Sequence, residues 1–113
     1  MFNRGPAIPT VEVEQLPSGG YLLLDVREDD EWECGHAPEA VHLPMSELMA
    51  RVEEVPADRK VYVICKVGGR SAQVVGYLNA QGRETVNVAG GMLAWAAAGR
   101  PMVGKSGADP FVA

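Results

Sequence analysis

The sequence predicts an α/β domain built on a mostly parallel sheet. Short unbroken apolar runs alternate with segments of helical periodicity, and glycine or proline stands between them. This alternation is typical of crossover units, in which a helix connects two parallel strands of one sheet. With 113 residues, the chain is long enough to form one domain with its own hydrophobic core.

Five segments are predicted strands, and the first in the chain, Thr10-Val11, is expected at an edge of the sheet. The run 21–26 follows the turn pair Gly19-Gly20 and is apolar up to Asp25, as expected of a strand buried on both faces. The other segments contain β-branched and aromatic residues, which favour strands. They are Thr10-Val11, Ala40-Val41-His42-Leu43, Val61-Tyr62-Val63-Ile64 and Thr85-Val86-Asn87-Val88.

Helices are predicted between and after these strands from their end signals and their periodicity. The predicted helices are 47–52 with Ser46 as N-cap, 71–80 opened by Ser71 and ended by Gly82, and a last one around Met92, Leu93, Trp95 and Ala96 that Gly99 and Pro101 close. We expect an arm over residues 1–7, a domain over 8–103 and a tail over 104–113, because both ends are rich in small or turn-forming residues.

Composition and charge exclude several classes of function. The net charge is -5 and there is no block of basic residues, so the chain offers no platform for nucleic acid. No stretch approaches the roughly 20 apolar residues of a membrane span, and the first ten residues do not resemble a secretory signal. We therefore expect a cytoplasmic protein without nucleic-acid or membrane partners, whose two cysteines are thiols.

The chemistry is predicted in the segment 65–71, which leaves a predicted buried strand and enters a predicted helix. Ligands of α/β sheets bind at the carboxyl ends of the strands, which is where Cys65 lies. The N–H groups and partial positive charge of a helix N-terminus favour a thiolate. The alternative is that Cys65 is a small buried apolar residue, as most free cysteines are.

The residues after Cys65 are suited to binding an anion beside a reactive sulfur. Gly68 and Gly69 allow the backbone to curl tightly, so that successive N–H groups converge on one point. Lys66 and Arg70 add positive charge at the rim, and a guanidinium fits an oxyanion such as a sulfonate or a phosphate. The predicted substrate-binding residues of the loop are Lys66, Val67, Gly68, Gly69, Arg70 and Ser71.

This loop resembles that of the rhodanese-like domain family, and the resemblance extends over nearly the whole chain, from about residue 8 to residue 101. Three further motifs occur in the family's order, although Ala37 and Glu39 stand where the family usually has isoleucine and glycine. The motifs are Leu24-Asp25-Val26-Arg27, Glu31-Trp32-Glu33-Cys34-Gly35-His36-Ala37-Pro38-Glu39-Ala40 and Val88-Ala89-Gly90-Gly91-Met92-Leu93-Ala94-Trp95.

The resemblance implies a five-stranded parallel sheet with helices on both faces. It also implies that Cys65 carries a persulfide, which the backbone N–H groups of residues 66–70 surround. Sulfurtransferases of this fold have a six-residue loop that begins at the cysteine, whereas related phosphatases have seven, with arginine six positions after cysteine. Arg70 is five positions after Cys65. The loop length therefore favours sulfur over phosphoryl transfer.

Five further polar residues are candidates for a functional role, and each also has a structural interpretation. Asp25 and Arg27 are candidate substrate-binding residues at the base of the site, with a buried ion pair or a backbone contact as the alternative. Cys34, His36 and His42 lack the paired spacing of a zinc site, so no metal or other cofactor is expected.

The predicted function is a rhodanese-type thiosulfate sulfurtransferase. Cys65 takes a sulfur from thiosulfate or a persulfide donor and passes it to a thiol, a protein acceptor or cyanide by a ping-pong mechanism. One alternative is a binding module of this fold without turnover. Another is a redox sensor, which requires that Cys34 reach Cys65. Phosphatase or arsenate-reducing activity is disfavoured by the loop length.

Overall fold

A computed structural model of the protein describes residues 7–113, so all of the predicted arm except Ala7 lies outside the described residues. The chain forms a five-stranded sheet in the order β1-β5-β4-β2-β3, and every neighbouring pair is parallel. This confirms the predicted fold class. The strands are β1 (Thr10–Val11), β2 (Leu22–Asp25), β3 (Val41–His42), β4 (Val61–Ile64) and β5 (Thr85–Val88).

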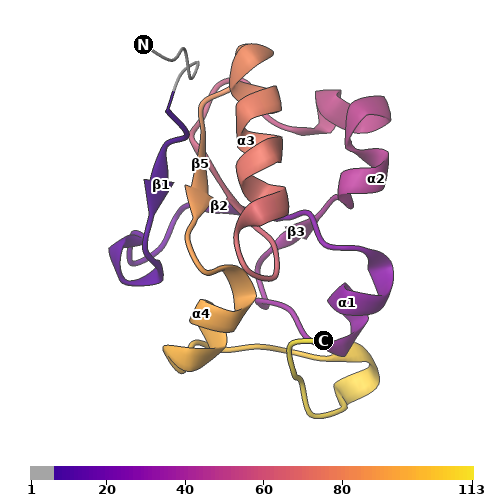
Figure 1. Ribbon diagram of the computed structural model, residues 1–113. Helices are drawn as coiled ribbons and strands as arrows, with labels where there is room; N and C mark the ends of the chain where they lie inside the picture. The colour runs from indigo at the N-terminus through magenta and orange to yellow at the C-terminus, as the bar shows by residue number, and fades with distance from the viewer. Residues whose placement is uncertain (1–6) are drawn as a thin grey trace.

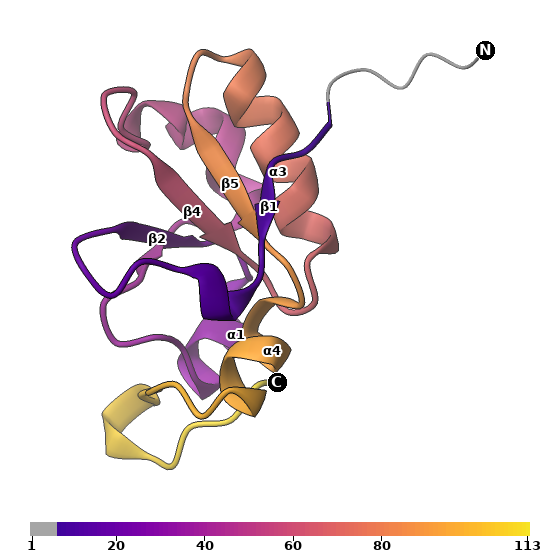
Figure 2. The ribbon, with the colours of Figure 1, turned by 90° about the vertical axis from the view of Figure 1, so that its left-hand side faces the viewer.

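Helices cover both faces of this sheet (Figures 1 and 2). Helices α2 and α3 pack on one face, while α4 and the 3₁₀ turn η1 pack on the other. The helices are α1 (Asp29–Cys34), α2 (Met45–Leu48), α3 (Gly69–Ala80) and α4 (Gly91–Ala97), with 3₁₀ turns η1 (Val13–Gln15), η2 (Met49–Glu54) and η3 (Lys105–Gly107).

The core consists of two apolar clusters, one on each side of the sheet, because side chains alternate along a strand. In β4, Val61 and Val63 join the cluster under α3, while Tyr62 and Ile64 join the cluster under α4. All four residues are buried. Full burial stabilises each such side chain by about 1.5–3 kcal/mol. The central strand is therefore a rigid support for the loop that follows it.

Two helix starts differ from the sequence prediction. Pro44, not Ser46, precedes α2, and the Ser46 hydroxyl instead donates a hydrogen bond to Glu28 at 2.7 Å. The predicted helix 47–52 continues as a 3₁₀ turn, in which Arg51 has a non-helical φ of -124°. Helix α3 begins at Gly69, two residues before the predicted start, and Ser71 turns its side chain toward Cys65.

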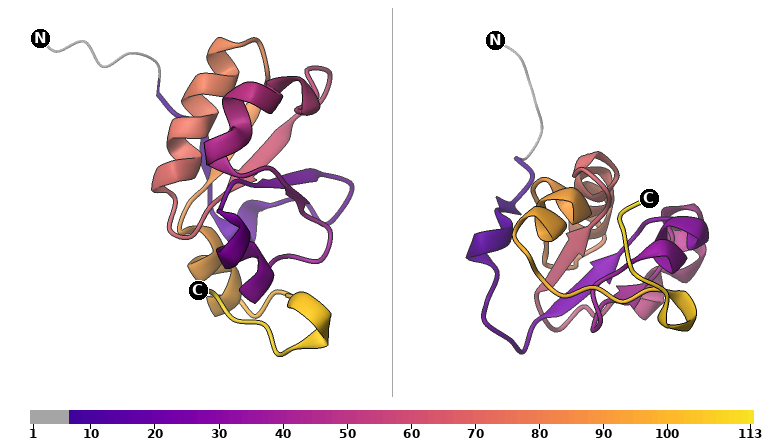
Figure 3. Two further views of the ribbon diagram at one scale, coloured as in Figure 1. Left: turned by 90° about the vertical axis from the view of Figure 1, so that its right-hand side faces the viewer. Right: turned by 90° about the horizontal axis from the view of Figure 1, so that it is seen from below.

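The segment after α4 runs beneath the sheet toward α1, as the view from below shows (Figure 3). Backbone bonds join His36 and Val103 in both directions, at 3.0 and 2.9 Å, and the Phe111 N–H donates to the Cys34 carbonyl at 3.0 Å. The predicted boundary of the tail at residue 104 stays a prediction. Within residues 7–113, none of the helices has the length and apolar character needed to cross a bilayer.

Candidate active site

Cys65 directly follows β4, and the segment 65–71 connects this strand to α3. Because all strands are parallel, their carboxyl ends meet at one edge of the sheet, where Asp25 and Val88 end the two neighbours of β4. Ligand sites of open α/β sheets lie at this edge. The fold therefore brings the predicted loop to the position where a site is expected.

The loop wraps around the sulfur of Cys65 and directs hydrogen-bond donors at it. The Gly68 N–H lies 3.1 Å from Sγ and the Ser71 N–H lies 3.3 Å from it. The Ser71 hydroxyl is 3.2 Å from the same sulfur. The first turn of α3, a helix of 12 residues, thus points its N–H groups at Cys65. This environment favours negative charge on the sulfur.

Two glycines permit this backbone path. Gly68 has a φ of 112°, in a region that other residues rarely adopt. Gly91, at the start of α4 with a φ of 54°, lies against the carbonyl oxygens of Cys65 and Lys66, and a Cβ there would overlap both. The close approach lets α4 bind the outer side of the loop.

The first turn of α4 holds the loop carbonyls away from the sulfur. The Met92 N–H donates to the Cys65 carbonyl at 2.8 Å, and the Leu93 N–H donates to the Lys66 carbonyl at 3.1 Å. The two sides of a peptide unit point in opposite directions, so carbonyls bound on the outside leave the N–H groups on the inside. Helix α4 thereby helps to determine that the N–H groups of the loop point toward the sulfur and its carbonyl groups point away from it.

The pKa of the Cys65 thiol is set by opposing effects. Burial raises this pKa, whereas hydrogen bonds from the Ser71 hydroxyl and from the N–H groups of Ser71, Gly68 and Val67 lower it. The hydrogen bonds prevail, and the pKa lies below that of an ordinary thiol. A lowered pKa increases the thiolate fraction at neutral pH.

A hydrogen-bonded chain connects Cys65 to Ser71 and then to Asn87 in β5. The Ser71 hydroxyl donates to the Asn87 Oδ1 at 2.5 Å, and both side chains are buried. A hydroxyl has one proton, so while it donates to Asn87 it accepts from the Cys65 thiol. When Cys65 is ionised, the hydroxyl can donate to the thiolate only by turning away from Asn87, whose amide can then supply an N–H.

The cations at the rim differ in their pairing. Arg70 forms a two-pronged ion pair with Glu31, with Nη1–Oε1 and Nη2–Oε2 distances of 2.7 and 2.9 Å. The hydrogen bond from Arg70 lowers the pKa of Glu31 to about 2. Lys66 is a partly buried residue and forms no ion pair within residues 7–113. Lys66 follows Cys65 directly in the chain and is thus a cation of this loop that no acidic side chain pairs within the described residues.

Asp25 and Arg27 are completely buried and bind each other at the end of β2. Arg27 Nη2 donates to Asp25 Oδ2 at 2.9 Å and Nε donates to Oδ1 at 3.0 Å. The guanidinium also donates to the carbonyls of Gly35 and Glu31, at 2.7 and 3.3 Å. These contacts fasten α1 to the sheet, and none reaches Cys65. They support the structural alternative for both residues.

Sequence reasoning missed α1 and two of the residues that complete the site. A capping box starts α1, in which the Glu28 and Glu31 side chains each accept from the other residue's backbone N–H. The spacing of these two acids was a signal for this helix start. Asn87 also had a signal, since it is an amide within a β-branched strand, and a buried amide needs a hydrogen-bond partner. The structure buries it, with 6% of the residue exposed.

The histidines and Cys34 form no metal site. Trp32 is stacked between His36 and His42, with ring centroids 3.6 and 4.5 Å apart and near-parallel planes. Among residues 7–113, no cluster of three or more His, Cys, Asp or Glu side chains could hold a metal ion. Cys34 and Cys65 are both free thiols.

Comparison with known proteins identifies the class to which this fold and loop belong. The family described as the rhodanese-like domain matches residues 11–98. The chain belongs to this family, as the sequence motifs predicted. A sulfurtransferase of Allochromatium vinosum is 42% identical over 87 residues, which are 76% of this chain and 81% of that protein.

Two further relatives support the same assignment. YtwF of Bacillus subtilis, provisionally named a sulfurtransferase, is 44% identical over 79 residues, or 70% of this chain and 77% of that protein. The crystal structure of a rhodanese-like domain protein from Staphylococcus aureus is similar with a TM-score of 0.74 and 31% identity. That similarity covers 92% of this chain and 99% of that one.

Proposed function

We propose that this protein is a sulfurtransferase that carries sulfur as a persulfide on Cys65. The observation that carries the proposal is the convergence of the Gly68 and Ser71 N–H groups and the Ser71 hydroxyl on Sγ, at 3.1–3.3 Å. These donors favour the thiolate that attacks the donor, and they favour the anionic persulfide that results. Sulfurtransferase is also the name of the relative that is 42% identical.

The proposed reaction has two steps, with thiosulfate as the sulfur donor and cyanide as the acceptor. The Cys65 thiolate attacks the outer sulfur of thiosulfate, a Cys–S–S bond forms, and sulfite leaves with the electron pair of the broken S–S bond. Cyanide then attacks the outer sulfur of the persulfide, thiocyanate leaves, and the thiolate is restored. A thiol acceptor reacts in the same way and becomes a persulfide. No metal or cofactor takes part in either step.

Thiosulfate is one of two donor types that the proposal includes, and the rim charges bear on the choice. A persulfide donor needs little positive charge, whereas dianionic thiosulfate needs a cation near its sulfonate. Lys66, the residue after Cys65, is the candidate for this cation, because the Arg70 guanidinium is paired with Glu31. We expect Glu31→Gln to free this guanidinium and lower the KM for thiosulfate. Arg70→Ala leaves Glu31 unpaired and should raise the KM for thiosulfate more than it lowers kcat. The expected decrease in kcat/KM is about ten- to a hundredfold.

The decisive test of the proposal is the location of the transferred sulfur. The protein is incubated with thiosulfate, and the intact mass and the proteolytic peptides are measured. One added sulfur is expected on the peptide that contains Cys65 and none on the peptide that contains Cys34. Cys65→Ser should lose turnover with thiosulfate and cyanide, while Cys34→Ser keeps it. Wild-type turnover by Cys65→Ser would refute the proposal.

Peptide mapping after oxidation distinguishes the redox-sensing alternative. Treatment of the thiosulfate-free protein with hydrogen peroxide should leave Cys34 and Cys65 in separate peptides under non-reducing conditions. A disulfide between them, together with sulfur found on Cys34, would favour a sensor. Turnover of an aryl phosphate by the wild-type protein would contradict the argument from loop length.

A further inference from the structure

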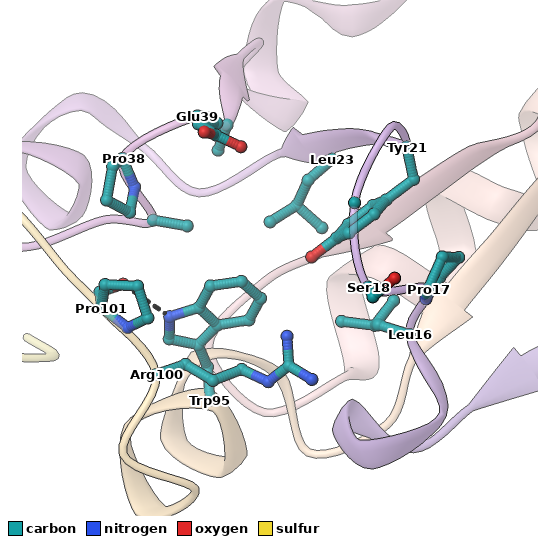
Figure 4. Close-up of a pocket in the computed structure, with 13 residues that line it drawn as sticks. Leu16, Pro17, Ser18, Tyr21, Leu23, Pro38, Glu39, Trp95, Arg100 and Pro101 are labelled. Carbon is teal, nitrogen blue, oxygen red and sulfur yellow. Dashed lines mark hydrogen bonds between the residues drawn. The ribbon is translucent and has the colours of Figure 1, made fainter.

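A pocket of about 470 Å³ lies on the face of the sheet that α4 and η1 cover. It lies between the connection from η1 to β2, the residues before β3, and α4 with the turn that follows it (Figure 4). None of residues 65–71 lines it. The volume falls within the roughly 300–1,000 Å³ that is typical of small-molecule sites.

The floor of this pocket is apolar and rigid. Leu16, Leu23 and Trp95 contribute to it, and all three belong to the buried cluster on this side of the sheet. The Trp95 indole N–H donates to the Pro101 carbonyl at 2.9 Å, which fixes the orientation of the ring. A fixed indole beside aliphatic side chains is a surface on which a flat apolar group packs with little loss of side-chain freedom.

Two polar groups reach the space above the floor. The Arg100 guanidinium lies 5.2 Å from the centre of the Trp95 ring, and its Nη2 donates to the Val13 carbonyl at 3.0 Å. Its Nε and Nη1 make no hydrogen bond to residues 7–113. The Tyr21 hydroxyl also has no partner among these residues, and Figure 4 shows it directed into the pocket beside the indole.

The arrangement of charge orients an anionic ligand. Arg100 is a positive charge at one side of the pocket, and one of its hydrogen bonds already holds it in place. Glu39 is exposed at the rim near Pro38 and disfavours a second negative charge there. A ligand with one carboxylate therefore places that group at Arg100 and Tyr21, and its apolar part toward Leu23 and Pro38.

We propose that this pocket binds small aromatic carboxylates, with the ring against Trp95 and Leu23 and the carboxylate hydrogen-bonded to Arg100 and Tyr21. The pocket is independent of sulfur transfer, since Cys65 and its loop contribute nothing to its lining. Binding should therefore persist in Cys65→Ser. Loss of turnover and loss of ligand binding are then separate results, and each tests its own proposal.

The first test titrates the full ¹⁵N-labelled chain with 1-naphthaleneacetate and follows the spectrum by NMR. The expected shifts centre on the Trp95 indole N–H and on the backbone of Tyr21, Leu23 and Arg100. The Trp32 indole N–H lies outside the pocket and is the internal control. The neutral amide, 1-naphthaleneacetamide, has nearly the same shape and should bind at least tenfold more weakly, because it lacks the charge that Arg100 recognises.

The second test uses variants that remove the same charge inside and outside the pocket. Arg100→Gln should weaken binding of 1-naphthaleneacetate about ten- to a hundredfold, whereas Lys60→Gln on the exposed surface should leave it within about twofold. Thermal unfolding of both variants checks that they fold. Equal affinity for the acid and its amide in the wild-type protein would overturn the proposal without any variant, as would shifts centred on Trp32.

Discussion

Removal of the Ser71 hydroxyl should make Cys65 a weaker acid. This hydroxyl lies 3.2 Å from Sγ, and its hydrogen bond is the first among those that lower the pKa of the thiol. A hydrogen bond to a charged group contributes about 1.5–3 kcal/mol. Ser71→Ala should therefore destabilise the thiolate by about this amount and raise the pKa of Cys65.

The assay is the pH dependence of alkylation of Cys65 by iodoacetamide, which reacts with the thiolate. Peptide mass separates Cys65 from Cys34, and the midpoint of the profile reports the pKa. Ser46→Ala is a matched control, because its hydroxyl contacts Glu28 at 2.7 Å instead of the sulfur. Coincident profiles for the wild-type protein and Ser71→Ala would refute the assigned role of this hydroxyl.

The same substitution has a second expected effect, on stability. Ser71→Ala leaves the buried Asn87 oxygen without the donor that now lies 2.5 Å away. An unsatisfied buried acceptor costs about 1–3 kcal/mol, so the free energy of unfolding should fall by this amount in urea titrations. The alkylation profiles must therefore be recorded where unfolding measurements show that the variant is folded.

Three further predictions concern the supports of the site. Gly91→Ala should lower the free energy of unfolding by about 2–5 kcal/mol, from backbone strain and overlap with the loop carbonyls, in urea titration. Gly99→Ala is its control, since Gly99 also has positive φ but has open space around it, and should cost about 1–2 kcal/mol. Arg27→Leu leaves Asp25 buried without its counterion and should cost about 3–5 kcal/mol by the same measurement, whereas Arg51→Leu, which breaks an exposed ion pair, should change the free energy of unfolding far less. The pKa of Glu31 is lowered to about 2 from an ordinary 4.5, so its stabilising contribution is present above pH 4.5 and is lost as pH falls toward 2. Between pH 4.5 and pH 2, the free energy of unfolding of Glu31→Gln should therefore fall by about 1–2 kcal/mol less than that of the wild-type protein. This value is reduced for solvent screening, because Arg70 is 35% exposed.

The sequence predicted the interior of the fold well, because local patterns determine it. The strand 61–64 was predicted with its observed bounds, since an apolar β-branched run buried on both faces has few alternatives. Helix α1 was missed because its six residues, Asp29–Cys34, are mostly acidic and none of them is buried. Such a helix has no apolar periodicity, and its capping box is the remaining local signal.

The candidate site was predictable where it is local and unpredictable where it is not. The loop 65–71 is contiguous, so its glycines and charges could be interpreted together. The partner of Arg70 is Glu31, 39 positions earlier, and no periodicity connects them. Likewise, Ser71 meets Asn87 only because β5 is the neighbour of β4 in the sheet. Pairings of this kind depend on the strand order, which local patterns do not specify.

The attachment of the loop to α4 bears on which positions are free to vary. Met92 and Leu93 bind the loop through its backbone carbonyls, and the donors that face the sulfur are largely backbone groups as well. The side chains of Lys66 and Val67 take no part in either set of bonds, and Val67 is 59% exposed. Substitutions at these two positions can therefore change which molecule approaches the sulfur, while the backbone N–H groups around the sulfur keep their positions. Side chains of this short segment would then determine selectivity and its backbone groups would determine reactivity. A protein engineer could change the selectivity by substituting Lys66 or Val67 and leave the backbone groups around the sulfur unchanged.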